Sequence, residues 1–176
     1  MRVIGGEFRS RRLKTLPGAA LRPTPDILRQ ALFNVLGARI EGAVFLDAYA
    51  GCGAVGIEAL SRGAVRAIFI EKHAAAVRAI RQNLNALGLE HRATVMEGSA
   101  VGLLGRHPAD IVFLDPPYAL EREYTAALER LGLAPPPLVL VQHSKHFWLE
   151  AVYGALRRTR TLAHGDNRVS FYQPRT

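Results

Sequence analysis

Glycines and carboxylates occur in one stretch of the chain with the spacing of an adenosine-binding site. An apolar run ends at Asp47 and leads into Gly51, Gly53 and Gly56, after which apolar residues recur at helical spacing. Glycines let a backbone approach a ligand closely, and the start of a helix offers unpaired amide groups. Glu71 ends the next apolar run, where its carboxylate can accept both hydroxyls of a ribose. We therefore predict a cofactor that contains adenosine.

Asp47 helps to distinguish between two adenosine cofactors. Beside the pyrophosphate of a dinucleotide its carboxylate would be a like charge, whereas it would attract the ammonium group of a methionine moiety. This favours S-adenosylmethionine over NAD, and an NAD-binding oxidoreductase is the weaker alternative because no catalytic acid or base is identifiable. The carboxylate can also accept amides of its own loop. Cys52, within the loop, is interpreted as a small side chain in a tight turn rather than an activated thiol.

A second motif, Asp115-Pro116-Pro117-Tyr118, follows a buried apolar run and supplies the predicted catalytic residues. Two prolines fix the backbone and remove two amide donors, so nearby carbonyls become rigid acceptors. Asp115 and the Pro116 carbonyl can both accept from one exocyclic amine and turn its lone pair toward a methyl donor. Tyr118 offers a flat face to a base turned out of its stack. Methylation at a pyrimidine carbon is excluded, because it needs a cysteine nucleophile outside the cofactor loop.

Composition limits the class of protein. The chain has 176 residues, 49% of them hydrophobic and 22% charged, which suits one domain with a sizeable core. The 23 Lys and Arg against 15 Asp and Glu give a net charge of +8, which suggests nucleic acid as a partner. One cysteine excludes a disulfide framework, and no cluster has metal-ligand spacing, so we expect no metal. The first residues lack the apolar stretch of a signal peptide, and we expect a cytoplasmic protein without a membrane segment.

Short apolar runs alternate with helical patterns from residue 43 onward. This alternation predicts an α/β fold with a mainly parallel sheet covered on both faces. The expected strands are Ala43–Ala48, Ala67–Glu71, Ala93–Glu97, Ile111–Asp115 and Leu138–Gln142, closed by the antiparallel pair Arg157–Ala163 and Val169–Gln173. The expected helices are Pro25–Leu36 with Thr24 as its cap, Val55–Arg62, Ala74–Leu87, Tyr124–Leu131 and Phe147–Leu156.

Residues 1–20 are interpreted as a basic extension of the catalytic core, residues 21–176, the two together forming one domain. Gly5 and Gly6 lie between short apolar positions and predict a tight hairpin turn. The cations around the turn favour contact with phosphates over a merely solvated edge. The predicted RNA contacts are Arg2, Arg9, Arg11, Arg12 and Lys14. His143 and His146, after the fifth strand, are interpreted as surface or satisfied residues.

Taken in chain order, these motifs resemble the RsmD-type bacterial methyltransferases. The similarity runs through Arg2–Leu13, Leu21–Thr24, Leu32–Asn34, Asp47–Gly53, Gly56–Ala64 and Asp115–Tyr118. The resemblance implies a Rossmann-like class I fold, with a seven-stranded, mainly parallel sheet, helices on both faces and an N-terminal β-hairpin. It also implies S-adenosylmethionine-dependent methylation of the exocyclic N2 amine of a guanine in 16S rRNA during small-subunit maturation.

The resemblance extends to the site residues. The cofactor residues it implies are Asp47, Tyr49, Ala50, Gly51, Gly53, Glu71, Lys72, Ser99, Ala100 and Thr24, and it places Arg22 over the cofactor or at the RNA entrance. Three positions depart from the family pattern: Cys52 replaces Ser or Thr, Ser99 replaces an Asp or Asn, and Gln142 replaces an acid. Adenine recognition is therefore expected to depend more on the backbone around Ala100.

The expected partner is 16S rRNA or a small-subunit ribosomal particle, bound by a monomer. One alternative is a DNA N6-adenine methyltransferase, which is disfavoured because no separate target-recognition domain is evident. Another is a non-catalytic RNA-binding assembly factor with the same fold. The intact Asp115–Tyr118 motif argues against that alternative.

Overall fold

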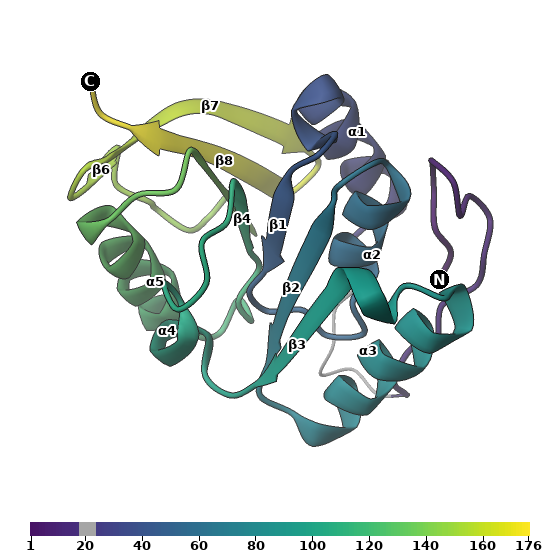
Figure 1. The fold of residues 1–176 in the computed structure, drawn as a ribbon. Helices are drawn as coiled ribbons and strands as arrows, with labels where there is room; N and C mark the ends of the chain where they lie inside the picture. Colours follow the sequence, from purple (N-terminus) through teal and green to yellow (C-terminus); the bar gives the residue numbers. More distant parts are fainter. Residues whose placement is uncertain (18–23) are drawn as a thin grey trace.

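A mixed sheet forms the centre of the protein in the computed structural model, which describes residues 1–17 and 24–176 (Figure 1). Eight strands are present in these residues, in the order β3-β2-β1-β4-β5-β8-β7-β6. They are β1 (Val44–Asp47), β2 (Arg66–Glu71), β3 (Ala93–Glu97), β4 (Ile111–Leu114), β5 (Leu138–Ser144), β6 (Val152–Tyr153), β7 (Leu156–His164) and β8 (Asn167–Pro174). β1 to β5 are parallel, and β8, β7 and β6 add antiparallel pairs. The predicted parallel sheet with a closing antiparallel pair is confirmed.

Helices cover both faces of the sheet (Figure 1). They are α1 (Asp26–Leu36), α2 (Ala54–Ser61), α3 (Ala74–Leu87), α4 (Ala100–Leu103) and α5 (Glu121–Leu133), with short 3-10 turns at Gly37–Ile40 and Glu90–Arg92. One apolar cluster joins α1, α2 and α3 to the sheet, and a second cluster joins the sheet to α5. Among the described residues, no helix is long and apolar enough to span a membrane.

The order of the strands explains where a ligand site can form. β1 is followed along the chain by its neighbour β2, whereas the other neighbour of β1 is β4. The connection after β1 therefore runs to one side of this strand, and the connection into β4 arrives on its other side. Where the order reverses in this way, the carboxyl ends of β1 and β4 open into a crevice. Asp47, the last residue of β1, pairs with Phe113 of β4, two residues before Asp115.

Gly56 allows α2 to lie close to the sheet. A Cβ atom at this position would overlap the ring of Phe69 on β2. The backbone of α2 therefore approaches β2 more closely than any residue with a side chain would permit. This contact fixes the start of α2 over the end of β1, where the glycine loop is.

The helix predicted over Phe147–Leu156 is wrong. The segment consists of bends, turns and irregular backbone around the short strand β6, which raises the strand count in the described residues from the expected seven to eight. The prediction rested on apolar residues at helical spacing, and Leu149, Tyr153 and Leu156 are indeed buried. Gly154 takes a left-handed conformation with φ of 57° against the backbone of α5, and this turn is incompatible with a helix.

The N-terminal segment also differs from the tight hairpin that Gly5 and Gly6 predicted. A single antiparallel bridge joins Arg2 to Arg12, and the turn occupies residues 5–10. Gly6 serves a different purpose, because a Cβ there would overlap the carbonyl of Ser61 at the end of α2. The glycine pair thus permits close docking of the segment on the core.

Candidate active site

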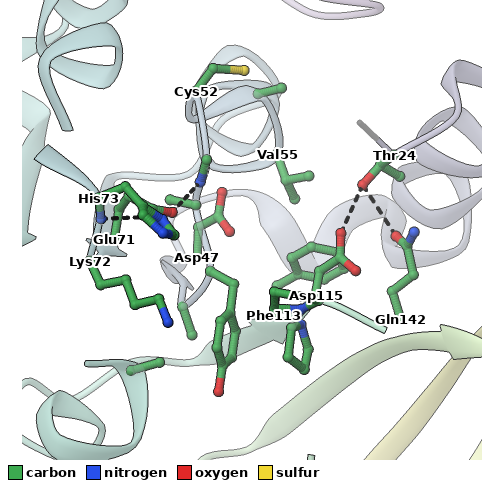
Figure 2. A pocket seen from close by; sticks show the side chains of 18 of the residues that line it. Thr24, Asp47, Cys52, Val55, Glu71, Lys72, His73, Phe113, Asp115 and Gln142 are labelled. Carbon is green, nitrogen blue, oxygen red and sulfur yellow. Dashed lines mark hydrogen bonds and ion pairs between the residues drawn. The ribbon is translucent and has the colours of Figure 1, made fainter. Parts of the chain in front are cut away.

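A cavity of about 890 Å³ lies at the carboxyl ends of β1, β2 and β4. It brings together the glycine loop, the acidic ends of two strands and the Asp115–Tyr118 motif. Figure 2 shows Glu71 on one side of this space, Asp115 on the other and Asp47 between them. The two motifs that the sequence predicted separately therefore share one site.

Glu71 is held by the loop that it was predicted to accompany. Its Oε2 accepts the amide of Gly51 at 2.8 Å, and its Oε1 accepts the amide of His73 at 3.0 Å (Figure 2). Oε1 also lies 2.9 Å from Nδ1 of His73, whereas Oε2 accepts one amide and keeps an acceptor position for a hydroxyl. Gly53 takes a left-handed φ of 89° and ends the loop at the start of α2.

Asp47 is buried at the end of β1. Its Oδ2 accepts the amide of Gly56 in α2 at 3.0 Å, so one of the two roles considered for it, acceptor of loop amides, is present. Burial raises the pKa of Asp47 to about 7, the Gly56 amide opposes this rise, and the nearby charge of Glu71 adds to it. A cation next to this carboxylate would favour its ionised form.

The remaining cofactor residues named from the sequence also line the cavity. These are Tyr49, Ala50, Lys72, Ser99 and Ala100. The hydroxyl of Tyr49 donates to Glu123 of α5 at 2.7 Å, and burial raises the pKa of Tyr49. The Ser99 hydroxyl accepts the Gly102 amide and so caps α4. Burial also raises the pKa of Cys52, the direction opposite to thiolate activation.

The Asp115–Tyr118 motif is held by two residues that the sequence did not reveal. The buried Tyr124 of α5 donates its hydroxyl to the Pro116 carbonyl at 3.2 Å. Tyr118 donates its hydroxyl to Oδ1 of Asn167, the first residue of β8, at 2.7 Å. No local pattern links Asn167 to Tyr118, since the strand pairing alone brings them together.

Thr24 occupies a different position from the one predicted for it. It does not cap α1, which begins after Pro25 without a side-chain cap. Its hydroxyl lies 3.5 Å from Oδ2 of Asp115 and 3.2 Å from Oε1 of Gln142, as Figure 2 shows. Thr24 lines the cavity beside the predicted catalytic residues.

His143 lies within β5 and His146 follows that strand, and both match their interpretation as satisfied or surface residues. His143 is buried, and its Nε2 lies 2.8 Å from the hydroxyl of Ser170. Burial lowers the pKa of His143. His146 is exposed, and the neighbouring Lys145 pairs with Asp166 at 2.9 Å.

The basic residues of the N-terminal segment lie on its surface. Arg2, Arg9, Arg11, Arg12 and Lys14 are all exposed. Met1, Thr15 and Leu16 line the cavity, so the segment extends to the edge of the site. Arg22 lies outside the described residues. Within the part of the chain that the structure describes, no group of three or more His, Cys, Asp or Glu could hold a metal ion.

This sheet order, with a glycine loop where β1 ends, defines a class I S-adenosylmethionine-dependent methyltransferase fold. The solved structure of yhhF from Escherichia coli is 34% identical, with a TM-score of 0.84 and coverage of 99% of this chain and 98% of its own. An RNA methyltransferase from Salinibacter ruber, solved with S-adenosyl-L-homocysteine, has the same fold at 19% identity and a TM-score of 0.67. That match covers 88% of this chain and 94% of the other.

Sequence comparison narrows the class to a family. The family described as "Conserved hypothetical protein 95" matches residues 1–173. Ribosomal RNA small subunit methyltransferase D of Escherichia coli K12 is 40% identical over 81% of this chain and 74% of its own. YlbH of Bacillus subtilis 168 is 34% identical over 99% of this chain and 100% of its own. The chain belongs to this RsmD-type family, as its motifs suggested.

Proposed function

We propose that the protein transfers the methyl group of S-adenosylmethionine to the exocyclic N2 amine of a guanine in 16S rRNA during maturation of the small ribosomal subunit. The observation that carries this proposal is the shared cavity, which Asp115–Tyr118 line together with the glycine loop and Glu71. Relatives named ribosomal RNA small subunit methyltransferase D support the choice of RNA.

The chain offers a partner for each part of the cofactor. The carboxylate of Glu71 accepts the ribose hydroxyls, with one acceptor position open on Oε2 beside the Gly51 amide and a second on Oε1 when the exposed His73 ring turns away. The carboxylate of Asp47 faces the ammonium group, and that pairing offsets the cost of ionising a buried acid. The backbone around Ala100, at the start of α4, serves adenine recognition.

Asp115 and the Pro116 carbonyl orient the amine for transfer. The N2 lone pair attacks the methyl carbon, a new nitrogen–carbon bond forms, and the carbon–sulfur bond breaks with its electron pair staying on sulfur. The cofactor leaves as a neutral thioether, and the nitrogen loses its extra proton to the Asp115 carboxylate and then to water. Two acceptors that hold the amine hydrogens stabilise the nucleophilic, pyramidal nitrogen of the transition state.

The Pro116 carbonyl contributes even though it already accepts from Tyr124, because a carbonyl oxygen has two lone pairs. Tyr118 presents its ring to the flipped base, with the far end of the ring anchored at Asn167. The exposed cations of the N-terminal segment, together with Arg22, contact the phosphates of the RNA. Their positive charge adds affinity without reading the sequence.

Incubation with labelled S-adenosylmethionine tests this function. The substrates are 16S rRNA and small-subunit particles from cells that lack the modification, with duplex DNA and fully modified rRNA as controls. Digestion to nucleosides should give labelled N2-methylguanosine from the unmodified rRNA or particle only. N6-methyladenosine from DNA would overturn the proposed substrate, and cofactor binding without any product would indicate a non-catalytic RNA-binding factor.

A further inference from the structure

Three side chains from distant parts of the chain meet at one wall of the cavity (Figure 2). The Thr24 hydroxyl lies within hydrogen-bond distance of both the Asp115 carboxylate and the Gln142 amide, at 3.5 and 3.2 Å. Thr24 is 9% exposed and Gln142 is 4% exposed, and both line the cavity. The amide of Gln142 is therefore a polar group built into the site beside the proposed catalytic carboxylate.

The Thr24 hydroxyl fixes the orientation of this amide. A hydroxyl has one hydrogen, and the shorter of its two contacts directs that hydrogen to Oε1 of Gln142. Oε1 then faces Thr24, and the two hydrogens of Nε2 point away from it. Among the described residues, the buried side-chain nitrogens and oxygens without a hydrogen-bond partner belong to Arg29 alone. The only hydrogen bond of the Gln142 side chain to a described residue is at Oε1, so Nε2 is not fully buried and, on a residue that lines the cavity, can donate to a ligand there.

We propose that Gln142 selects guanine by donating from Nε2 to O6 of the target base, an inference that rests on the proposed N2 methylation. Guanine carries its 2-amine and O6 at the two ends of its Watson–Crick edge, which is exposed when the base is flipped out of its stack. When the 2-amine lies at Asp115, that edge extends along the wall where Gln142 lies. A donor at this place pairs with a carbonyl oxygen and opposes an amine, so Gln142 is a specificity-determining residue.

One base analogue changes this contact. 2,6-Diaminopurine keeps the 2-amine that receives the methyl group, carries an amine where guanine has O6, and has no hydrogen on N1. The N1 difference is the same for every protein variant, so the effect of a Gln142 substitution on the ratio of the two RNAs reports the contact at position 6. The amine at position 6 and the fixed Nε2 of Gln142 are both donors, so no hydrogen bond forms between them. A site built to hydrogen-bond one group rejects an analogue that cannot form the bond, because a buried polar group is left unpaired.

The experiment uses an RNA fragment with either guanine or 2,6-diaminopurine at the nucleotide that the wild-type enzyme methylates. The measured quantity is kcat/KM for each RNA, from labelled S-adenosylmethionine and nucleoside analysis. The wild-type protein should prefer guanine by about 10- to 100-fold. Gln142→Ala should lower this preference, mainly by slowing guanine. Gln142→Glu, which replaces the donor by an acceptor, should shift the ratio toward 2,6-diaminopurine.

Two further variants test the geometry. Thr24→Val removes the hydroxyl that fixes the amide, which can then rotate, so discrimination against 2,6-diaminopurine should fall. Gln173→Ala, on β8 and outside the cavity lining, is the matched control and should leave the ratio unchanged. Melting temperature and S-adenosylhomocysteine affinity confirm that each variant is folded.

The outcomes separate the two proposals. If the wild-type protein forms no N2-methylated product on unmodified 16S rRNA or on the particle, the proposed function is wrong and the inference falls with it. If it does form this product, but Gln142→Ala and Gln142→Glu keep the wild-type ratio of the two RNAs, the proposed function stands and Gln142 does not read O6.

Discussion

Cofactor affinity should depend on pH through Asp47. Burial raises the pKa of this carboxyl to about 7 in the cofactor-free protein. The ammonium group of S-adenosylhomocysteine favours the ionised carboxylate, so binding lowers this pKa and releases a proton. The bound form holds fewer protons than the free form. Affinity is therefore complete above pH 7 and is lost as the pH falls through that value.

The magnitude follows from the position of the pKa. At pH 6, one unit below it, about nine-tenths of the cofactor-free protein carries a protonated Asp47, so affinity should be about tenfold weaker, or about 1.4 kcal/mol. At pH 5 the loss should approach about 100-fold. Above pH 7 the carboxylate is ionised in the free protein as well, so the affinity should reach a plateau there.

Calorimetry from pH 5.5 to 8.5 measures this dependence, and repetition in buffers of different ionisation enthalpy counts the protons released. The control ligand is 5′-methylthioadenosine, which keeps the adenosine but lacks the ammonium group. Its affinity should not show the loss below pH 7. Asp47→Asn, which carries no charge at any pH, should bind S-adenosylhomocysteine weakly throughout, and its difference from the wild-type protein should be greatest above pH 7. Equal pH profiles for the two ligands, or no proton release at pH 6.5, would refute the role given to Asp47.

Three other predictions concern the substrate side. Asp115→Ala should lower turnover by about 100- to 1000-fold while S-adenosylhomocysteine affinity in calorimetry stays near the wild-type value, and near-normal turnover would contradict it. Tyr118→Ala should raise KM for RNA through a loss of about 1 to 3 kcal/mol of stacking. Tyr118→Phe keeps the ring but loses its anchor, at about 1 kcal/mol, so equal damage from both would argue against stacking. Replacing Arg9, Arg11 and Arg12 together should weaken RNA binding and flatten its salt dependence by roughly one unit or less per lost contact, without changing cofactor affinity. An unaltered salt slope would show that the segment is structural.

The part of the cavity formed by the glycine loop, Asp47 and Glu71 could be predicted, because the sequence pattern that indicates it is local. Asp47, Gly51 and Gly53 follow one another at the end of a single strand, and Glu71 ends the next strand. The sheet pairs these two strands side by side, so sequence order translates directly into position. The same reasoning placed Asp115 at the end of β4, although it could not give the contacts around that residue.

The contacts around the Asp115–Tyr118 motif depend on strand pairing and could not be predicted. Thr24 resembled a helix cap because a proline and an acid follow it, but its hydroxyl is used by side chains 91 and 118 positions away. Asn167 reaches Tyr118 only because β8 returns antiparallel beside β5. Local propensity has no access to such distant partners, and tertiary contacts override it.

A buried carboxylate on α2 joins the N-terminal segment to the core. Glu58 of α2 is completely buried, and its two oxygens accept the amides of Ile4 and Gly5 at 2.9 Å each. Arg62 pairs with the same carboxylate at 2.8 Å, and the buried Arg29 of α1 donates to the carbonyl of Arg2. A buried carboxylate that lost these donors would be left uncompensated, which is strongly destabilising. The basic segment is therefore held in a fixed orientation relative to α2, the helix that begins at the glycine loop.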